Sequence, residues 1–169
     1  MAGNGMLAGL VAICSGIGDM TATGAIITGL VAGTIVVLAV TAIERMQVDD
    51  PVGAFSVHGI CGFWGLIATG LFATSAGTNG SEVEGLFYGG GAGLLVDQLI
   101  GGVAIAAFVS LTAGLLFLAM KSAGVFRVSP EEEVEGLDVA EHGAPGYGPD
   151  MMAGAAGGVP TGLDAPVKV

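Results

Sequence analysis

The chain has 169 residues, of which 53% are hydrophobic and only 11% are charged. An ordinary soluble domain carries about 25% charged residues, so a soluble fold of this composition could not cover its surface. Only four residues are basic, too few for a nucleic-acid-binding patch. The composition therefore argues against an ordinary soluble fold and against nucleic-acid recognition, and it favours a protein of the lipid bilayer.

Four apolar segments follow one another along the chain, and each is predicted to be a membrane helix. They cover residues 5–18, 23–43, 51–73 and 90–120, within a membrane region of residues 1–122. The first segment is short for a span, whereas the others are long enough to cross about 30 Å of hydrocarbon. The predicted fold class is all-α, with polytopic membrane helices.

The few basic residues predict an orientation. Arg45 lies between the second and third segments, and Lys121 and Arg127 follow the fourth, whereas residues 74–89 contain no lysine or arginine. Because basic residues favour the cytoplasmic side, the Arg45 loop and the C-terminus are predicted to be cytoplasmic, in a multi-pass protein of the cell membrane. Four spans would place the N-terminus in the cytoplasm as well.

The chain changes character after the fourth segment. Eight of the 15 acidic residues follow residue 128 and account for most of the net charge of −11. Residues 123–147 are predicted to be a cytoplasmic C-terminal segment. Residues 148–169 are predicted to be a disordered tail, because glycine, alanine and proline dominate there.

The third segment begins with a helix-start signal, Asp49-Asp50-Pro51. An aspartate accepts hydrogen bonds from the free N–H groups of a first helical turn, and proline at the first position loses no bond there. Paired carboxylates also suit the positive end of the helix dipole. A structural role at the helix start is therefore predicted for Asp49, Asp50 and Pro51.

His58 lies about eight residues into the same segment, roughly 12 Å from its start and therefore near the bilayer midplane. Ionisable residues at this depth are costly and usually face a helix-bundle interior or a pathway. A neutral imidazole can hold a small polar solute or relay a proton. The alternative is a buried histidine that only hydrogen-bonds to a neighbouring helix.

Gly59, Gly62 and Gly65 recur at three-residue spacing beside this histidine and predict one stripe for close helix packing. Cys14 and Cys61 lie in apolar segments without a CxxC pair, and we expect both to be small buried hydrophobic residues. No metal or cofactor site is predicted.

Three stretches carry a resemblance to a known family. Residues 4–11, which read NGMLAGLV, are similar to the eighth helix of the ammonium transporter family. Residues 49–72, with the letters DDP, VHG, CG and GLF, resemble its tenth helix. Residues 127–143, with RV, EGLD and EHG, resemble its cytoplasmic C-terminal segment. Together the resemblance covers about residues 4–147.

The resemblance implies the C-terminal part of an eleven-helix fold built from two inverted repeats, of which this chain would hold helices eight to eleven. Family members are trimers with one pore per subunit. Ammonium loses a proton at the outer side, and ammonia then crosses a hydrophobic pore past two histidines. By motif position His58 matches the second histidine, and Ala54 and Phe55 accompany it on the substrate pathway. The resemblance thus implies ammonium transport and not an enzyme.

It also implies that the first repeat, with the other pore histidine, lies outside this chain. The chain is then a fragment, or its complement is a separate chain, and pore formation needs the missing N-terminal helices. The family's tail motif is matched by Gly136, Asp138, His142 and Gly143. In the family this tail couples subunits, and in many members it is regulated by a PII-type signal protein. Two alternatives stay open: an ammonium-sensing regulatory protein, and a small membrane protein or fragment without transport activity.

Overall fold

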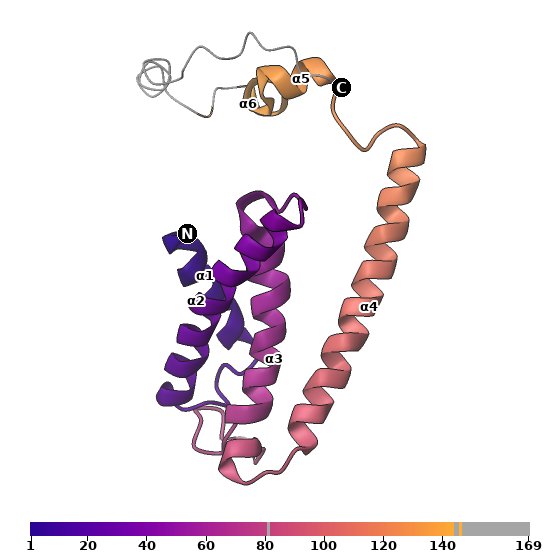
Figure 1. Ribbon diagram of the computed structural model, residues 1–169. Coiled ribbons are helices and arrows are strands. Elements are labelled where there is room, and N and C mark those ends of the chain that lie inside the picture. The colour runs from indigo at the N-terminus through magenta and orange to yellow at the C-terminus, as the bar shows by residue number, and fades with distance from the viewer. Residues whose placement is uncertain (81, 144–145, 147–169) are drawn as a thin grey trace. The chain divides into compact units, whose positions relative to one another are not determined.

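The computed structural model describes residues 1–80, 82–143 and 146, and the chain divides into two compact units, Met1–Thr112 and Ala113–Val169. The regular elements of the described residues are helical, and Figure 1 labels the α-helices. They are α1 (Ala2–Cys14), α2 (Ala22–Arg45), η1 (Pro51–Gly53), η2 (Phe55–Ile60), α3 (Cys61–Phe72), η3 (Leu86–Tyr88), α4 (Gly93–Ser122), α5 (Pro130–Glu135) and α6 (Leu137–His142).

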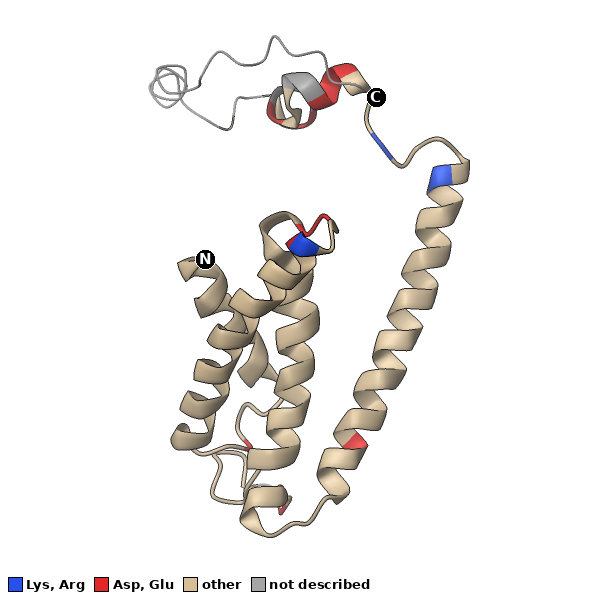
Figure 2. Cartoon of the chain, viewed as in Figure 1, with Lys and Arg blue, Asp and Glu red and all other residues tan. Residues whose placement is uncertain are grey.

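The predicted all-α membrane fold is confirmed. Among the described residues, three helical stretches are long and apolar enough to cross a bilayer: Ala22–Arg45, Pro51–Phe72 and Gly93–Ser122. In the three long apolar stretches, charged residues lie near the ends and the rest of each stretch is almost free of charge, whereas the short helices near the C-terminus are rich in acidic residues (Figure 2). α4 begins at Gly93, three residues later than predicted, because the preceding Gly89 and Gly91 adopt positive φ angles that interrupt a helix.

α1 differs from the predicted segment of residues 5–18. It begins at Ala2 and ends at Cys14, because the chain turns away over the next residues and reaches a left-handed conformation at Gly18 (φ 88°). Its 13 residues extend over about 20 Å, less than the hydrocarbon thickness. The side chain of Cys14 is exposed, contrary to the prediction, whereas Cys61 is buried as predicted.

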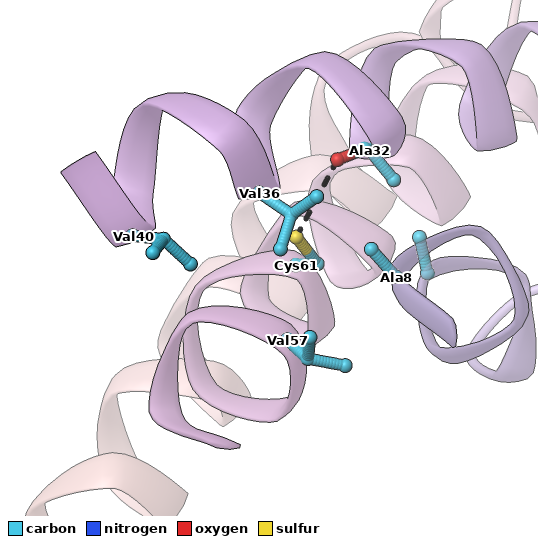
Figure 3. Close-up of a cluster of buried hydrophobic side chains, with 7 residues drawn as sticks. Ala8, Ala32, Val36, Val40, Val57 and Cys61 are labelled. Atoms are coloured by element: carbon cyan, nitrogen blue, oxygen red, sulfur yellow. Dashed lines mark hydrogen bonds between the residues drawn. The ribbon is translucent and has the colours of Figure 1, made fainter. Parts of the chain in front are cut away.

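The core of the first unit lies where α1, α2 and the third span meet (Figure 3). Its members are small residues with almost no exposed surface: Ala8, Ala12, Ala32, Val36, Val40, Val57 and Cys61. Small residues let helix backbones approach closely, and this close packing holds helices together where the hydrophobic effect is absent. A Cβ atom built on Gly9 of α1 would lie 3.7 Å from the Cα atom of Gly29 of α2, so these two backbones are almost in contact.

The third span is not the single helix predicted for residues 51–73. It consists of a 3₁₀ turn (η1), a π-helical stretch (η2) and an α-helix (α3). The cause lies at Val52 and Gly53, whose φ angles of 56° and 71° cannot continue a right-handed helix. At the junction with α3, the N–H of Cys61 donates to the carbonyl of Ser56, five residues back, which is the π-helical pattern.

Two loops meet at the end of the first unit opposite to η1. The backbone N–H of Thr74 donates to the carbonyl of Asp19 (2.7 Å), and the N–H of Asn79 donates to the carbonyl of Gly18 (2.8 Å). The hydroxyls of Ser15 and Thr69 also hydrogen-bond, at 2.9 Å. The loops that follow α1 and α3 therefore satisfy each other's polar groups.

The second unit contains the end of α4 and two short helices. Ser129 caps α5 in a reciprocal capping box with Glu132, and Arg127 pairs with Glu133. Hydrogen bonds from the Ser129 backbone and hydroxyl lower the pKa of the Glu132 carboxyl below its ordinary value. The predicted disordered tail, residues 148–169, lies outside the described residues.

Candidate functional site

A cleft of about 410 Å³ lies within the first unit, between the third span and α4. Each side contributes residues at the spacing of one helix face, three or four positions apart. The third span contributes Phe55, His58, Gly59, Gly62, Phe63 and Leu66, and α4 contributes Gly102, Ile105, Ala106, Val109 and Ser110. The cleft is mostly apolar, and the only polar side chains among its lining residues are those of His58 and Ser110.

His58 lies on the η2 stretch, and its side chain is exposed in this chain. The helices α1 and α2 cover the opposite face of the span, so they do not bury His58. Ser56 and Val57 on that face are buried against α1 and α2. The imidazole borders the cleft.

The two residues predicted beside His58 differ in position. Phe55 lines the cleft with 62% of its surface exposed. A Cβ atom built on Gly59 would lie 2.8 Å from the Phe55 ring, so the absence of a side chain at Gly59 makes room for this ring. Ala54 is exposed at the start of η2, but it is not among the residues that line the cleft.

The three glycines predicted to form one packing stripe lie on two faces, which corrects that prediction. Gly59 and Gly62 line the cleft, whereas Gly65 packs against α1, where a Cβ atom would lie 3.1 Å from the Cα and carbonyl carbon atoms of Ala12 and closer still to its carbonyl oxygen. The reason is helical geometry: three residues turn the chain by about 300°, so residues at this spacing drift by about 60° per step around the helix.

Asp50 holds the start of η2 with both carboxylate oxygens. One oxygen accepts from the backbone N–H of Phe55 (2.8 Å), and the other accepts from the N–H (3.1 Å) and the hydroxyl (2.8 Å) of Ser56. The hydrogen bond from the Phe55 N–H, with those from Ser56, lowers the pKa of the Asp50 carboxyl below its ordinary value. Pro51 begins η1, and Asp49 is exposed in the preceding loop.

The sequence did not predict a role at this cleft for several lining residues, among them Phe63, Leu66 and Gly102. Gly102 approaches the third span closely: a Cβ atom there would lie 2.7 Å from the side chain of Leu66 and 2.8 Å from that of Phe63. The helical spacing of Phe63 and Leu66 from His58 could have identified them as residues on the same helix face. The same spacing could not have identified α4 as the helix across the cleft.

The four predicted tail residues lie in the second unit. Gly136, at φ 89°, separates α5 from α6, and Gly143, at φ 68°, follows the end of α6. Asp138 lies in the first turn of α6 and accepts from the N–H of Gly146 at 3.2 Å. His142 is exposed in the last turn of α6. In the described part of the chain, no three histidine, cysteine or acidic side chains lie together as metal ligands do.

These features define the class: an all-α integral membrane protein with a histidine that borders an apolar cleft between two spans. Residues 1–147 match the sequence profile of the Ammonium Transporter Family. The chain belongs to the ammonium transporter family, as the sequence motifs predicted.

Similar proteins come from plants and archaea. The chain is 38% identical to ammonium transporter 1 member 2 of Arabidopsis thaliana and 40% identical to ammonium transporter 1 member 3 of Solanum lycopersicum. It is also 40% identical to ammonium transporter Amt2 of Archaeoglobus fulgidus. Each match covers 85% of this chain but only 29%, 33% and 31% of the relative. The chain thus spans about a third of the length of these transporters.

Proposed function

We propose that the chain is the C-terminal part of an ammonium transporter, in which ammonia passes along the cleft beside His58 after ammonium has lost a proton at the outer side. The observation that carries this proposal is the position of His58, which borders an apolar cleft between two spans of a chain from this family. A bare ammonium ion loses its hydration at a large cost in such surroundings, whereas neutral ammonia loses little. Potassium and sodium have no proton to lose and are excluded.

The cleft supplies one side of the pathway. His58, Phe55 and Gly59 are exposed in this chain, so further helices are needed to enclose them. We propose that these helices come from an N-terminal part, on the same polypeptide or on another, and that the complete assembly is a homotrimer. Arg45, Lys121 and Arg127 favour a cytoplasmic tail in the cell membrane, where Gly136 to Gly143 would receive a PII-type signal protein.

The test measures methylammonium uptake by an assembled transporter. The 169-residue chain is co-expressed with the N-terminal region of the Archaeoglobus fulgidus relative that precedes the matched part, and the assembly is reconstituted in vesicles. His58→Ala is expected to lower uptake by about tenfold or more, because it removes the hydrogen-bonding group that replaces water in the pathway. Its free energy of unfolding should change by less than about 0.5 kcal/mol, because the side chain is exposed.

The matched control is His142→Ala, which removes the only other histidine of the chain. This variant should retain uptake in the absence of a signal protein. Equal uptake by His58→Ala and the unchanged chain would contradict the proposed pathway and would favour a membrane protein without a transport role for this span.

A further inference from the structure

The chain adopts an unusual backbone conformation just before the π-helical stretch that carries His58. Val52 has φ 56° and ψ 9°, in the left-handed region that β-branched residues avoid. Its side chain is 86% exposed, so burial of the valine does not stabilise this conformation. Strain of this kind persists only where the surrounding structure enforces it, and it is typical of functional sites.

Two side chains hold this turn from either side. Asp50, two residues before Val52, accepts from the N–H groups of Phe55 and Ser56, which follow the turn. Upstream in the sequence, Asn4 in the first turn of α1 donates from its Nδ2 atom to the carbonyl of Val52 at 3.0 Å. The two partners are 48 residues apart, so this bond connects α1 to the start of the third span.

Gly53, the residue after Val52, leaves the space that the Asn4 side chain occupies. A Cβ atom on Gly53 would lie 2.7 Å from the Nδ2 atom of Asn4 and 3.3 Å from the side chain of Val40. Gly53 is buried and has φ 71°, so only glycine fits here both sterically and conformationally. The bond between Asn4 and Val52 therefore depends on a glycine at the next position.

We propose that Asn4 is a positioning residue for His58: by binding the carbonyl of Val52, it holds the left-handed turn that sets the rotation and depth of the π-helical stretch. Asp50 also holds this stretch, because it accepts from the N–H groups of Phe55 and Ser56. A relaxed turn would rotate the stretch about its axis and move the imidazole away from the cleft. This role rests on the proposed function only for its consequence in transport, since the position of the ring can be measured by itself.

The position of the ring is measured by NMR on the full 169-residue chain in lipid nanodiscs, with ¹³C-labelled histidine. The chain has two histidines, so two ring signals are expected, and His142→Ala assigns them. Asn4→Ala should shift or broaden the His58 signal and leave the His142 signal in place. The matched control is Asn79→Ala, which removes the only other asparagine; this side chain donates to the carbonyl of Ile17 at the opposite end of α1 and should leave both signals unchanged.

Relief of the strain gives a rescue test. Glycine adopts positive φ without cost, so Val52→Gly should make the turn stable without Asn4. The double variant Asn4→Ala/Val52→Gly is then expected to restore the His58 signal. In the assembled transporter, Asn4→Ala should lower methylammonium uptake by roughly three- to tenfold, the effect of one net hydrogen bond, and the double variant should recover most of it.

The outcomes separate the two proposals. An unchanged His58 signal in Asn4→Ala, or no rescue by Val52→Gly, would overturn the positioning role of Asn4 whatever the transport result. Normal uptake by His58→Ala would overturn the proposed function and leave the NMR test intact. Fluorescence of Trp64, the single tryptophan, checks that each variant is folded. If Asn4→Ala unfolds, Asn4→Asp, which keeps the size but points an acceptor at the carbonyl, replaces it with the same expected shift.

Discussion

The two faces of the third span, Phe55–Phe72, are built in opposite ways. On one face, Val57, Cys61 and Gly65 are buried against α1 and α2. On the other face, His58 and Gly62 border a cleft that the chain leaves open. The difference teaches that the effect of a substitution in this span depends on the face: changes on the packed face should alter stability, and changes on the open face should alter conduction.

The largest effect on stability is expected from Gly65→Ala. Its methyl group would meet the backbone of Ala12, with Cα and carbonyl carbon both at 3.1 Å, and a backbone cannot move aside as a flexible side chain can. Such overpacking costs about 1–3 kcal/mol, more than the helix-forming advantage of alanine returns. The measurement is the free energy of unfolding in detergent, followed by circular dichroism.

The matched control is Gly62→Ala, three residues earlier on the open face. Its methyl group would lie 3.6 Å from the side chain of Val11, an ordinary contact. Its free energy of unfolding should be unchanged or about 1 kcal/mol higher, because no backbone of another element lies within 4 Å of the added methyl group. Equal destabilisation by both variants would refute the division into two faces.

An intermediate effect is expected from Trp64→Phe. The indole Nε1 atom donates to the carbonyl of Thr28 in α2 at 3.0 Å, so this side chain belongs to the packed face. Loss of the bond should lower the free energy of unfolding by about 1 kcal/mol. Uptake per folded molecule should be unchanged. A loss of uptake with unchanged stability would mean that Trp64 acts in the substrate pathway and not in helix packing.

The smallest effect concerns Asp50, at the point where both faces begin. Because the folded-state pKa of its carboxyl lies below the ordinary value of 3.8, its stabilising contribution is complete above that value. This contribution is lost as the pH falls through the folded-state pKa. Hydrogen exchange at the Phe55 and Ser56 amides, corrected for intrinsic rates, should therefore accelerate on acidification below 3.8. Asp50→Asn should show the faster exchange already at pH 7, and identical protection in both proteins would contradict this role.

Much of the fold could be predicted from the sequence, because long uncharged apolar segments have few alternatives to membrane helices. The α2 helix follows from that pattern. The end of α1 was harder to predict, because apolar residues continue past Cys14 and only the backbone of Gly18 shows where the chain turns.

Less of the candidate site could be predicted. The left-handed conformation of Val52 contradicts the preference of valine. It exists because Asn4 binds the carbonyl of Val52 and Asp50 binds the N–H of Phe55 that follows. No local pattern reports a bond between residues 48 positions apart. The three glycines could be assigned to two faces only once the partner helices were known.

The shortness of α1 has a consequence for biosynthesis. α1 ends at Cys14 and the chain continues as irregular backbone, whose polar groups need partners within the protein in an apolar environment. Those partners come late: the carbonyl of Asp19 accepts from the N–H of Thr74, 55 residues further along the chain, and the carbonyl of Gly18 accepts from the N–H of Asn79, 61 residues further. While the ribosome is still making α2, these two carbonyl groups lack their later partners. The loop after α1 therefore gains its final hydrogen bonds only after the loop that follows α3 has been made, so this part of the fold is completed out of chain order.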